Sequence, residues 1–508
     1  MKFFDQTKKY SVGSLELVVF ICGAVVMVFE LAGSRVLAPY LGTSIYIWTS
    51  LIGVILGSLS VGYWLGGKLA DKKSEIWYLS LIILLAAAAI GITVIIKDKV
   101  LIFFPISTTN WQWISSLISL ILFAPASILL GMVSPYALKL QLKDLAVSGR
   151  TAGSLYAIST VGSIVGTFFA GFYLIPHLGN TQILFLLAVI LILTSIFVAP
   201  KSLIKTKIAL LLFLVFFWCL TGLIRNITYQ RLGFLDLDTQ YNRIWIYQGV
   251  DLATGRPVIN LATDKMFAQS VRFLDSDELV AEYAKYYRLA KHFNPKIEKS
   301  LMLGGGGYSY PQDYLKNFPL ATIDVVEIDP KVTALARTYF GLEDNPRLKI
   351  YHEDGRLFLN QAEEKYDVIF GDVFNSFAAV PYQLATQEAI KREYEILNDG
   401  GVVIINIASA LAGDHGRFLQ AEYITYQSVF PQVYLLPVQA PQDSQQLQNI
   451  ILVALKSNDL PSWQSTDPEL NGYLQHLWVE PIADNLPVLV DNYAPVEYYQ
   501  RSLFTNKD

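Results

Sequence analysis

The segment Ser300–Gly307 has the sequence SLMLGGGG, a short apolar run followed directly by four glycines. The apolar run predicts a buried strand, and a helix-like pattern follows the glycines. Glycines at the end of a strand let the backbone pass close to a ligand and let the N-terminus of the next helix face it. Because glycine-rich turns after strands are common, the prediction of a nucleotide-binding α/β fold depends on the sequence that follows.

The chain after these glycines alternates between strand-like and helix-like patterns. Further strand-like runs lie at residues 321–328, 348–351, 366–371, 401–407, 432–438 and 449–456. Strands that alternate with helices predict a parallel sheet that binds its ligand at the carboxyl ends of the strands. The last two runs are expected to close the sheet.

Acidic residues stand at the ends of three of these strands. Glu327 lies about 20 residues after the glycines, where a carboxylate can accept hydrogen bonds from both hydroxyls of a ribose. Asp354 can accept from an adenine amino group, and Asp372 reaches the same edge. Taken singly, Glu327 could be a solvated strand end, Asp354 a turn residue and Asp372 a helix cap. Because all of them fall at successive strand ends of one sheet, together they predict an adenosyl-binding site. The predicted cofactor-binding residues are Gly304, Gly305, Gly306, Glu327, Asp354 and Gly355.

The segment before this unit has shorter strand-like runs. These are Arg243–Gln248 and Pro257–Leu261, and a polar, helix-like stretch follows at Asp275–His292. The pattern predicts a small β-subdomain that leads through a helix into the longer α/β unit.

The first half of the chain has a different composition. Hydrophobic residues make up 53% of the whole sequence and charged residues only 16%, which is too apolar for an ordinary soluble protein. A helix needs about 20 apolar residues to cross a bilayer. Seven runs satisfy this length, near residues 15–37, 47–67, 77–96, 113–136, 154–175, 181–199 and 207–224. We therefore predict a multi-pass helical membrane domain in a cell membrane.

Basic residues indicate how these helices are oriented, since cytoplasmic loops carry the excess of Lys and Arg. Every second loop is basic, which predicts a cytoplasmic N-terminus. The residues concerned are Lys2, Lys8, Lys9, Lys68, Lys72, Lys73, Lys139, Lys143, Arg150, Lys201, Lys205 and Lys207. Seven crossings would then leave the α/β domain outside, whereas the supply of an adenosyl cofactor favours the cytoplasm. The side of the soluble domain stays open.

The expected organisation is a membrane domain at 1–225 with about seven helices, a small β-subdomain with its linking helix at 226–295, a Rossmann-like domain at 296–456 and a tail at 457–508. A net charge of −4 without a basic cluster gives no support for nucleic-acid binding. Cys22 and Cys219 both lie in apolar runs, so neither a disulfide framework nor a metal site is expected.

At these residues the sequence resembles the spermidine synthase family, and more closely its membrane-fused relatives. The likeness to the synthase fold covers roughly residues 230–455, and the whole chain resembles the fused subgroup. The motifs that carry the resemblance are Val325–Pro330 (VVEIDP), Asp354–Arg356 (DGR), Gly371–Asn375 (GDVFN) and Asp491–Glu497 (DNYAPVE). The resemblance implies a class I methyltransferase-type Rossmann-like fold, and a homodimer, since spermidine synthases commonly form dimers or tetramers.

The resemblance also implies a reaction. The family transfers an aminopropyl group from decarboxylated S-adenosylmethionine to an amine such as putrescine or another polyamine. Glu327 would hold the ribose, Asp354 the adenine, and Asp372 would be the catalytic base. A sulfonium is a good leaving group, so such an enzyme mainly aligns the amine for in-line attack and removes its proton. An alkylammonium has a pKa of about 10, and a nearby carboxylate both attracts this cation and can accept its proton.

The sequence departs from the family where the amine is held. The family has an Asp after the glycine run and another three positions past the catalytic Asp, whereas this chain has Gly307–Tyr308 and Asn375. A Tyr-His pair of the family is replaced by Ala281–Glu282. The usual diamine clamp is therefore missing, and the amine acceptor stays open. The predicted substrate-binding residues are Tyr308, Tyr310, Asn375, Tyr382 and Glu282.

Two other functions compete with aminopropyl transfer. The same fold binds intact S-adenosylmethionine in methyltransferases, and Glu327 and Asp354 do not distinguish the two cofactors. A transporter or sensor with a non-catalytic adenosyl-binding domain is the third class, and the presence of Asp372 argues mildly against it.

Overall fold

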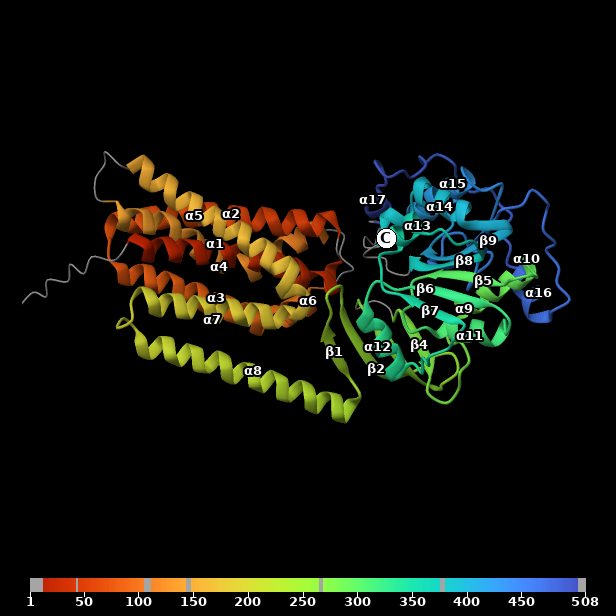
Figure 1. Cartoon of the computed structure of the whole chain (residues 1–508), viewed down its shortest axis with the longest axis horizontal. Helices are drawn as coiled ribbons and strands as arrows, with labels where there is room; N and C mark the ends of the chain where they lie inside the picture. Colours follow the sequence, from red (N-terminus) through yellow and green to blue (C-terminus); the bar gives the residue numbers. More distant parts are fainter. Residues whose placement is uncertain are drawn as a thin grey trace, which may run out of the picture. The chain divides into compact units, whose positions relative to one another are not determined.

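The computed structural model describes residues 12–42, 44–104, 111–142, 148–264, 268–374 and 380–500. The chain divides into two compact units, one that contains the long N-terminal helices and one that contains two β-sheets (Figure 1). Each unit is described by itself below.

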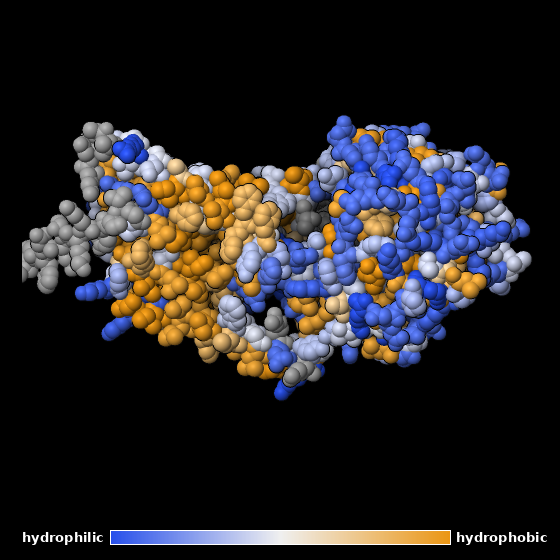
Figure 2. Space-filling model, in the orientation of Figure 1, coloured by the Kyte–Doolittle hydropathy of each residue, from blue (hydrophilic) through white to orange (hydrophobic). Residues whose placement is uncertain are grey.

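The first unit contains seven helical runs that are long and apolar enough to cross a membrane, among the residues that the structure describes. They are α1 (Val12–Leu41), α2 (Ile45–Lys72), α3 (Ile76–Phe103), α4 (Trp111–Gln141), the continuous run of α5 (Ser148–Phe169), η2 (Ala170–Leu174) and α6 (Ile175–His177), then α7 (Asn180–Val198) and α8 (Ile204–Leu232). On the face shown in Figure 2, hydrophobic side chains cover much of the helical unit, whereas hydrophilic ones cover most of the second unit. The seven predicted apolar runs are thus all helical, and α8 extends past the boundary expected at residue 225.

Glycines set the spacing between two helix pairs of this unit. Helix α2 packs along α4, and α1 packs along α5. A Cβ atom at Gly66 would lie 2.6 Å from the Cα of Met132, and one at Gly166 would lie 2.7 Å from the Cα of Ala24. Small residues let the backbones of neighbouring helices approach closely, as in membrane helix pairs.

The second unit begins with a four-stranded sheet in the order β1-β2-β3-β4. Its strands are β1 (Leu235–Asp238), β2 (Arg243–Val250), β3 (Pro257–Ala262) and β4 (Ser270–Phe273), and the β2–β3 and β3–β4 pairs are antiparallel. The predicted strands correspond to β2 and β3. The sequence pattern missed β1 and β4, which have only four residues each.

The linking helix is shorter than expected. It consists of α9 (Glu282–Tyr286), the 3-10 turn η3 (Tyr287–Leu289) and α10 (Ala290–Phe293). The preceding residues, which the sequence pattern also predicts as helix, instead form a loop in which Leu279 makes a β-bridge with Arg272. This loop covers one edge of the site described below.

A seven-stranded sheet forms the rest of the unit, in the order β10-β11-β9-β8-β5-β6-β7. Its strands are β5 (Lys299–Leu303), β6 (Thr322–Val326), β7 (Leu348–Tyr351), β8 (Tyr366–Phe374), β9 (Leu397–Ser409), β10 (Gln432–Pro437) and β11 (Gln448–Leu455). The pairs among β5 to β9 are parallel, and β10 and β11 are antiparallel to their neighbours. All seven strands match the predicted runs, which confirms the predicted fold class.

Helices connect these strands and cover the sheet (Figure 1). They are α11 (Ser309–Asn317), α12 (Pro330–Tyr339), α13 (Gly355–Gln361), α14 (Gln387–Ile396), α15 (Arg417–Gln427), α16 (Pro468–Leu474) and α17 (Val496–Gln500), with the 3-10 turns η4 (Tyr382–Leu384) and η5 (Asp414–Gly416). Successive residues of β5 belong to different hydrophobic clusters, Met302 to one and Leu301 and Leu303 to the other. Because side chains alternate along a strand, both faces of the sheet are buried.

Candidate active site

A glycine turn, Gly304–Gly307, connects β5 to α11. Gly304 has a φ of +90°, and a Cβ atom there would lie 2.8 Å from the backbone oxygen of Asp372. Gly306 has a φ of +49°, and its Cβ would lie 2.7 Å from the Oγ of Ser270. Only glycine combines this backbone conformation with so close an approach. The turn therefore lies directly against the end of β8 and against β4.

Ser270 fixes the turn from the small sheet. Its Oγ accepts a hydrogen bond from the backbone N–H of Gly307 at 2.8 Å. Sequence reasoning missed this contact because Ser270 belongs to no motif and β4 lies before the regular alternation of strands and helices.

Glu327 follows β6 and holds the turn from the other side. Its Oε2 accepts from the N–H groups of Gly305 and Gly306, both at 3.1 Å, and its Oε1 accepts from the N–H of Asp329 at 2.9 Å. The side chain is only 9% exposed. Burial raises the pKa of this carboxyl, and the three backbone donors partly offset that increase. Glu327 thus presents a partly desolvated acceptor at the sheet edge.

Asp354 lies after β7 and is the N-cap of α13. Its Oδ1 accepts from the backbone N–H groups of Arg356 at 2.9 Å and Leu357 at 3.1 Å. Its Oδ2 has no hydrogen-bond partner in the described part of the chain. The capping role of Asp354 therefore uses one carboxylate oxygen, and the other is available to a ligand.

The late motif Asp491–Glu497 contributes to the same region. Asp491 accepts from Arg356 Nη2 at 2.8 Å and from Thr386 Oγ1 at 2.7 Å. Arg356 Nη1 also donates to the carbonyl oxygen of Gln383 at 2.9 Å. These bonds fasten the first turn of α13 to the segment around η4, and so they keep Asp354 in place.

Asp372 stands where β8 leaves the regular ladder. The register of β8 against β9 shifts between Gly371 and Phe374. Tyr283 donates its hydroxyl to Asp372 Oδ2 at 3.2 Å, and Tyr287 donates to the carbonyl oxygen of Gly371 at 3.0 Å. The irregularity turns a half-buried carboxylate toward α9, where the tyrosine hydroxyl orients it.

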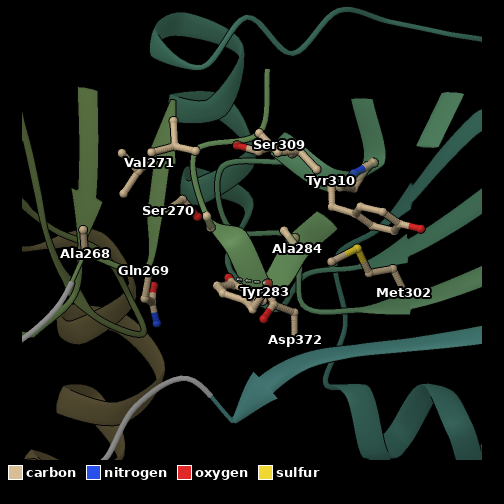
Figure 3. Close-up of a pocket in the computed structure, with 15 residues that line it drawn as sticks. Ala268, Gln269, Ser270, Val271, Tyr283, Ala284, Met302, Ser309, Tyr310 and Asp372 are labelled. Carbon is tan, nitrogen blue, oxygen red and sulfur yellow. Dashed lines mark hydrogen bonds between the residues drawn. The ribbon is translucent and has the colours of Figure 1, made fainter. Parts of the chain in front are cut away.

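A cavity of about 60 Å³ opens between these elements (Figure 3). Asp372 and Gly305 lie on one side of it, and β4, the loop before α9 and the start of α11 form its other walls. The lining residues are Ala268, Gln269, Ser270, Val271, Leu279, Val280, Ala281, Tyr283, Ala284, Met302, Gly305, Ser309, Tyr310, Pro311 and Asp372. The Oγ of Ser309 is buried and has no hydrogen-bond partner in the described part of the chain. A buried polar atom without a partner is costly, so this hydroxyl is suited to a ligand.

The predicted substrate-binding residues occupy different places. Tyr310 lines the cavity with its ring, which packs edge-on against Tyr287, while its hydroxyl donates to the Tyr287 carbonyl oxygen at 3.2 Å. Tyr308 does not line the cavity. Its side chain is fully buried under Gly305, and its hydroxyl shares a hydrogen bond of 2.7 Å with Thr333 Oγ1. The sequence position after the glycines made Tyr308 a candidate, but its left-handed backbone, with a φ of +57°, directs the ring into the core.

Two further predicted residues also lie outside this cavity. Tyr382 is 51% exposed on η4, and Glu282 forms an ion pair with Lys285 at 2.6 Å on the outer side of α9. Asn375 lies outside the described residues. Sequence reasoning missed Tyr283, Gln269 and Ser309, which come from three separate elements and share no motif.

Comparisons with known proteins agree with this geometry. Residues 287–460 match the family model of the spermine/spermidine synthase domain. A curated polyamine aminopropyltransferase of Vibrio vulnificus is 31% identical over 204 residues, which cover 40% of this chain and 62% of that protein. A probable polyamine aminopropyl transferase of Bifidobacterium longum is 32% identical over 172 residues, which cover 34% of this chain and 37% of that protein. The match therefore spans only part of the length of each curated relative.

A solved structure is also similar to the chain. It is a probable spermidine synthase from Corynebacterium glutamicum, with a TM-score of 0.39 and 22% identity, and the match covers 46% of this chain and 83% of that one. The predicted resemblance of the α/β unit to spermidine synthases is confirmed by the family model, whose matched region contains Glu327, Asp354 and Asp372.

Proposed function

We propose that this chain, whose α/β unit is spermidine synthase-like, is an aminopropyltransferase that uses decarboxylated S-adenosylmethionine and an amine. The observation that carries the proposal is the arrangement of Glu327, Asp354 and Asp372 at the carboxyl ends of three parallel strands, within the region that matches the family model. The curated relatives named above are aminopropyltransferases, which supports the same assignment.

The donor is proposed to lie along this edge of the sheet. Glu327 would accept hydrogen bonds from the ribose hydroxyls, as acidic residues at this position do in Rossmann-type folds. Asp354 Oδ2 would accept from the adenine amino group, since Oδ1 is already used by the cap of α13. The glycine turn leaves room for the donor because Gly304 and Gly306 have no side chains to occupy it.

Asp372 is proposed to act on the amine. It lines the cavity next to Gly305, and Tyr283 orients its carboxylate through a hydrogen bond. A carboxylate there attracts the incoming ammonium and accepts its proton, so that the nitrogen lone pair can attack the carbon next to the sulfonium. The site supplies alignment and proton transfer, and the donor supplies the leaving group.

The test is product formation by the full chain purified in detergent. Decarboxylated S-adenosylmethionine is mixed with a panel of amines, and methylthioadenosine is quantified by chromatography. We expect methylthioadenosine to form only with an amine present, and Asp372→Asn to remove most of this activity. Asp399→Asn, an exposed aspartate on β9, is the matched control and should behave like the parent protein. Formation of S-adenosylhomocysteine from the intact cofactor, without methylthioadenosine formation, would instead identify a methyltransferase.

The helical unit is proposed to cross a lipid bilayer. Its seven helices satisfy the required length and hydropathy, and an odd number of crossings would place the two ends of the unit on opposite sides. Extraction at alkaline pH should leave the protein in the membrane fraction. Labelling of an Asp459→Cys variant with a membrane-impermeant thiol reagent would identify the side of the α/β unit, since Asp459 is exposed.

A further inference from the structure

The cavity beside Asp372 has an unusual charge balance for a site that binds amines. Among its described lining residues, Asp372 is the one carboxylate, and none is Lys or Arg. The remaining polar groups are neutral, and the lining also includes the apolar residues Val271, Leu279, Val280 and Pro311. One cationic group can therefore be matched by a carboxylate in this cavity, and a second cannot.

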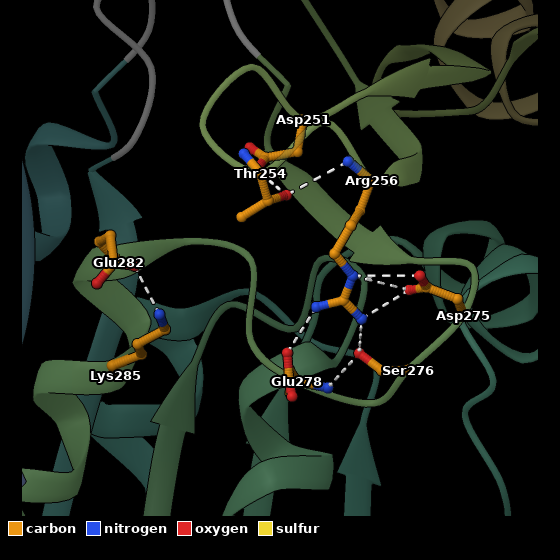
Figure 4. A network of polar contacts seen from close by, with 8 residues as sticks. All are labelled: Asp251, Thr254, Arg256, Asp275, Ser276, Glu278, Glu282 and Lys285. Atoms are coloured by element: carbon orange, nitrogen blue, oxygen red, sulfur yellow. Dashed lines mark hydrogen bonds and ion pairs between the residues drawn. The ribbon is translucent and has the colours of Figure 1, made fainter.

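Three acidic residues near the cavity form ion pairs with basic residues and do not line the cavity. Arg256 forms ion pairs of 2.7 Å with both Asp275 and Glu278, and Lys285 pairs with Glu282 at 2.6 Å (Figure 4). These acids flank the loop and helix that carry Leu279 to Ala284, but they do not line the cavity. Lys285 balances the charge of Glu282, and Arg256 balances one of the two charges of Asp275 and Glu278, so one negative charge of this network remains outside the cavity lining.

Two segments that the structure does not describe contain no acidic residue. Residues 265–267 read KMF and residues 375–379 read NSFAA, so neither segment contains Asp or Glu. Glu327, on the other side of the glycine turn, does not line the cavity and is assigned to the ribose of the donor.

We propose that the acceptor is a primary monoamine, with one ammonium group and a short uncharged body, and not a diamine or polyamine. This inference rests on the proposed aminopropyl transfer. A second ammonium on the acceptor would be buried against apolar side chains without a counter-charge, which is strongly unfavourable.

The reaction with such an acceptor is balanced. The nitrogen of the monoamine, after its ammonium has lost one proton, forms a bond with the aminopropyl carbon attached to sulfur. The C–S bond breaks, its electron pair stays on sulfur, and methylthioadenosine leaves as a neutral thioether. The proton that the monoamine loses before the attack goes to Asp372, which lines the cavity, and the product leaves as a secondary ammonium.

The size of the cavity agrees with a short acceptor. A volume of about 60 Å³ accommodates roughly four to six waters, at about 10–15 Å³ of this kind of volume for each water. Butylamine and putrescine have the same carbon chain and differ at one end, by a methyl group in place of an aminomethyl group. They are therefore matched probes for the second charge.

The test is calorimetric titration of the full chain, saturated with methylthioadenosine, with butylamine and with putrescine. We expect the Kd of butylamine to be at least about ten-fold lower than the Kd of putrescine. Equal affinity, tighter binding of putrescine, or binding of neither amine would overturn the proposal.

A variant with an added negative charge provides a second test. It compares the ratio of the two amine affinities and does not depend on how tightly the parent protein binds either amine. Gln269 lines the cavity, and Gln269→Glu adds a carboxylate of the same shape. The ratio of putrescine to butylamine affinity should rise by about ten-fold in this variant. Gln475→Glu, at an exposed position after α16, adds the same charge elsewhere and should leave the ratio unchanged. An unchanged ratio in Gln269→Glu would contradict the inference.

Turnover separates this inference from the proposed function. If butylamine is preferred in binding but no methylthioadenosine forms with any amine, aminopropyl transfer is wrong and the charge analysis of the cavity stands. If methylthioadenosine forms best with putrescine, aminopropyl transfer is supported and the monoamine inference is wrong.

Discussion

The carboxylate edge, made of Glu327, Asp354 and Asp372, and the neighbouring cavity are built in different ways. The edge takes its side chains from the ends of parallel strands that follow one another in the sequence. The cavity combines β4, a loop, α9 and α11 with the end of β8. Acidic groups dominate the edge, whereas the described cavity lining has one carboxylate and many apolar side chains.

This difference indicates that the fold itself specifies the binding of the donor but not the choice of the acceptor. A parallel sheet brings successive strand ends to one edge, so residues that bind the donor need only follow the strands. The acceptor would contact the segments that connect the strands, whose side chains can vary without changing the sheet. We therefore expect donor binding to follow the family and acceptor choice to be particular to this chain.

The largest effect is expected where the two regions meet. Asp372→Asn preserves the shape of the side chain and removes its capacity to accept a proton. The turnover number should fall by about 10²–10⁴-fold, the range for loss of a general base, while donor affinity changes little. Steady-state kinetics and calorimetry on the same sample separate the two quantities. Undiminished turnover would show that Asp372 is not the base.

Glu327→Gln tests the edge alone. Loss of a charged hydrogen-bond acceptor should weaken adenosyl binding by about 10–100-fold, equivalent to about 1.5–3 kcal/mol. Because burial raises the pKa of Glu327, the parent protein should lose donor affinity as the pH falls through a value above that of an ordinary glutamate. Calorimetry across a pH series measures both effects. Unchanged affinity in Glu327→Gln would remove the ribose assignment.

A buried carboxyl pair lies away from both regions. It provides a comparison, because we expect it to affect stability and not ligand binding. Glu393 accepts from the Tyr426 hydroxyl at 2.7 Å, and burial raises its pKa to about 7. Glu422 is fully buried nearby, and neither of its carboxylate oxygens has a partner in the described part of the chain.

The sign of the resulting pH dependence follows from linkage. The folded state holds the proton of Glu393 more tightly than the unfolded state, so its stabilising effect is fully present below pH 4.5 or so and is lost as the pH rises to about 7. In Glu393→Gln, the decrease in the free energy of unfolding over this pH range should be smaller by about 3 kcal/mol at most. Thermal unfolding in detergent at several pH values measures it, with exposed Glu395→Gln on the same helix as the control. An unchanged slope would show that Glu393 does not titrate in this range.

A smaller effect is expected from Tyr283→Phe, which removes the hydroxyl that donates to Asp372. The ring stays, so the cavity wall should be preserved. A neutral donor of this kind contributes about 1 kcal/mol, and kcat should fall by about five-fold with little change in the KM of the amine. A much larger loss would mean that the tyrosine itself takes part in proton transfer.

The smallest effect is expected at the outer wall of the cavity. Arg256→Gln breaks the ion pairs with Asp275 and Glu278 that hold the loop before α9. Since this network lies near the surface and is screened by solvent, its loss should change stability little and raise the KM of the amine by about two-fold. Arg337→Gln, which breaks an exposed pair with Asp344 elsewhere, is the control and should not alter the KM.

The sheet and its edge could be predicted from sequence because long apolar runs and the residues after them follow simple periodic rules. Strands β5 to β11, Glu327, Asp354 and Asp372 were all found in this way. Strand β4 was missed although β7, which also has four residues, was found, because β7 belongs to the regular alternation of strands and helices and β4 precedes it. Tyr308 shows a second limit, because a single left-handed residue directs its ring into the core instead of the cavity.

The central claim is tested most directly by calorimetric titration of the detergent-solubilised protein with decarboxylated and intact S-adenosylmethionine. The decarboxylated form should bind about ten-fold or more tightly, because it lacks the carboxylate that the intact cofactor would bring close to Asp372. The carboxylate of the intact cofactor would meet that same group, with no Lys or Arg among the described lining residues. Tighter binding of intact S-adenosylmethionine, or binding of neither compound, would contradict the account.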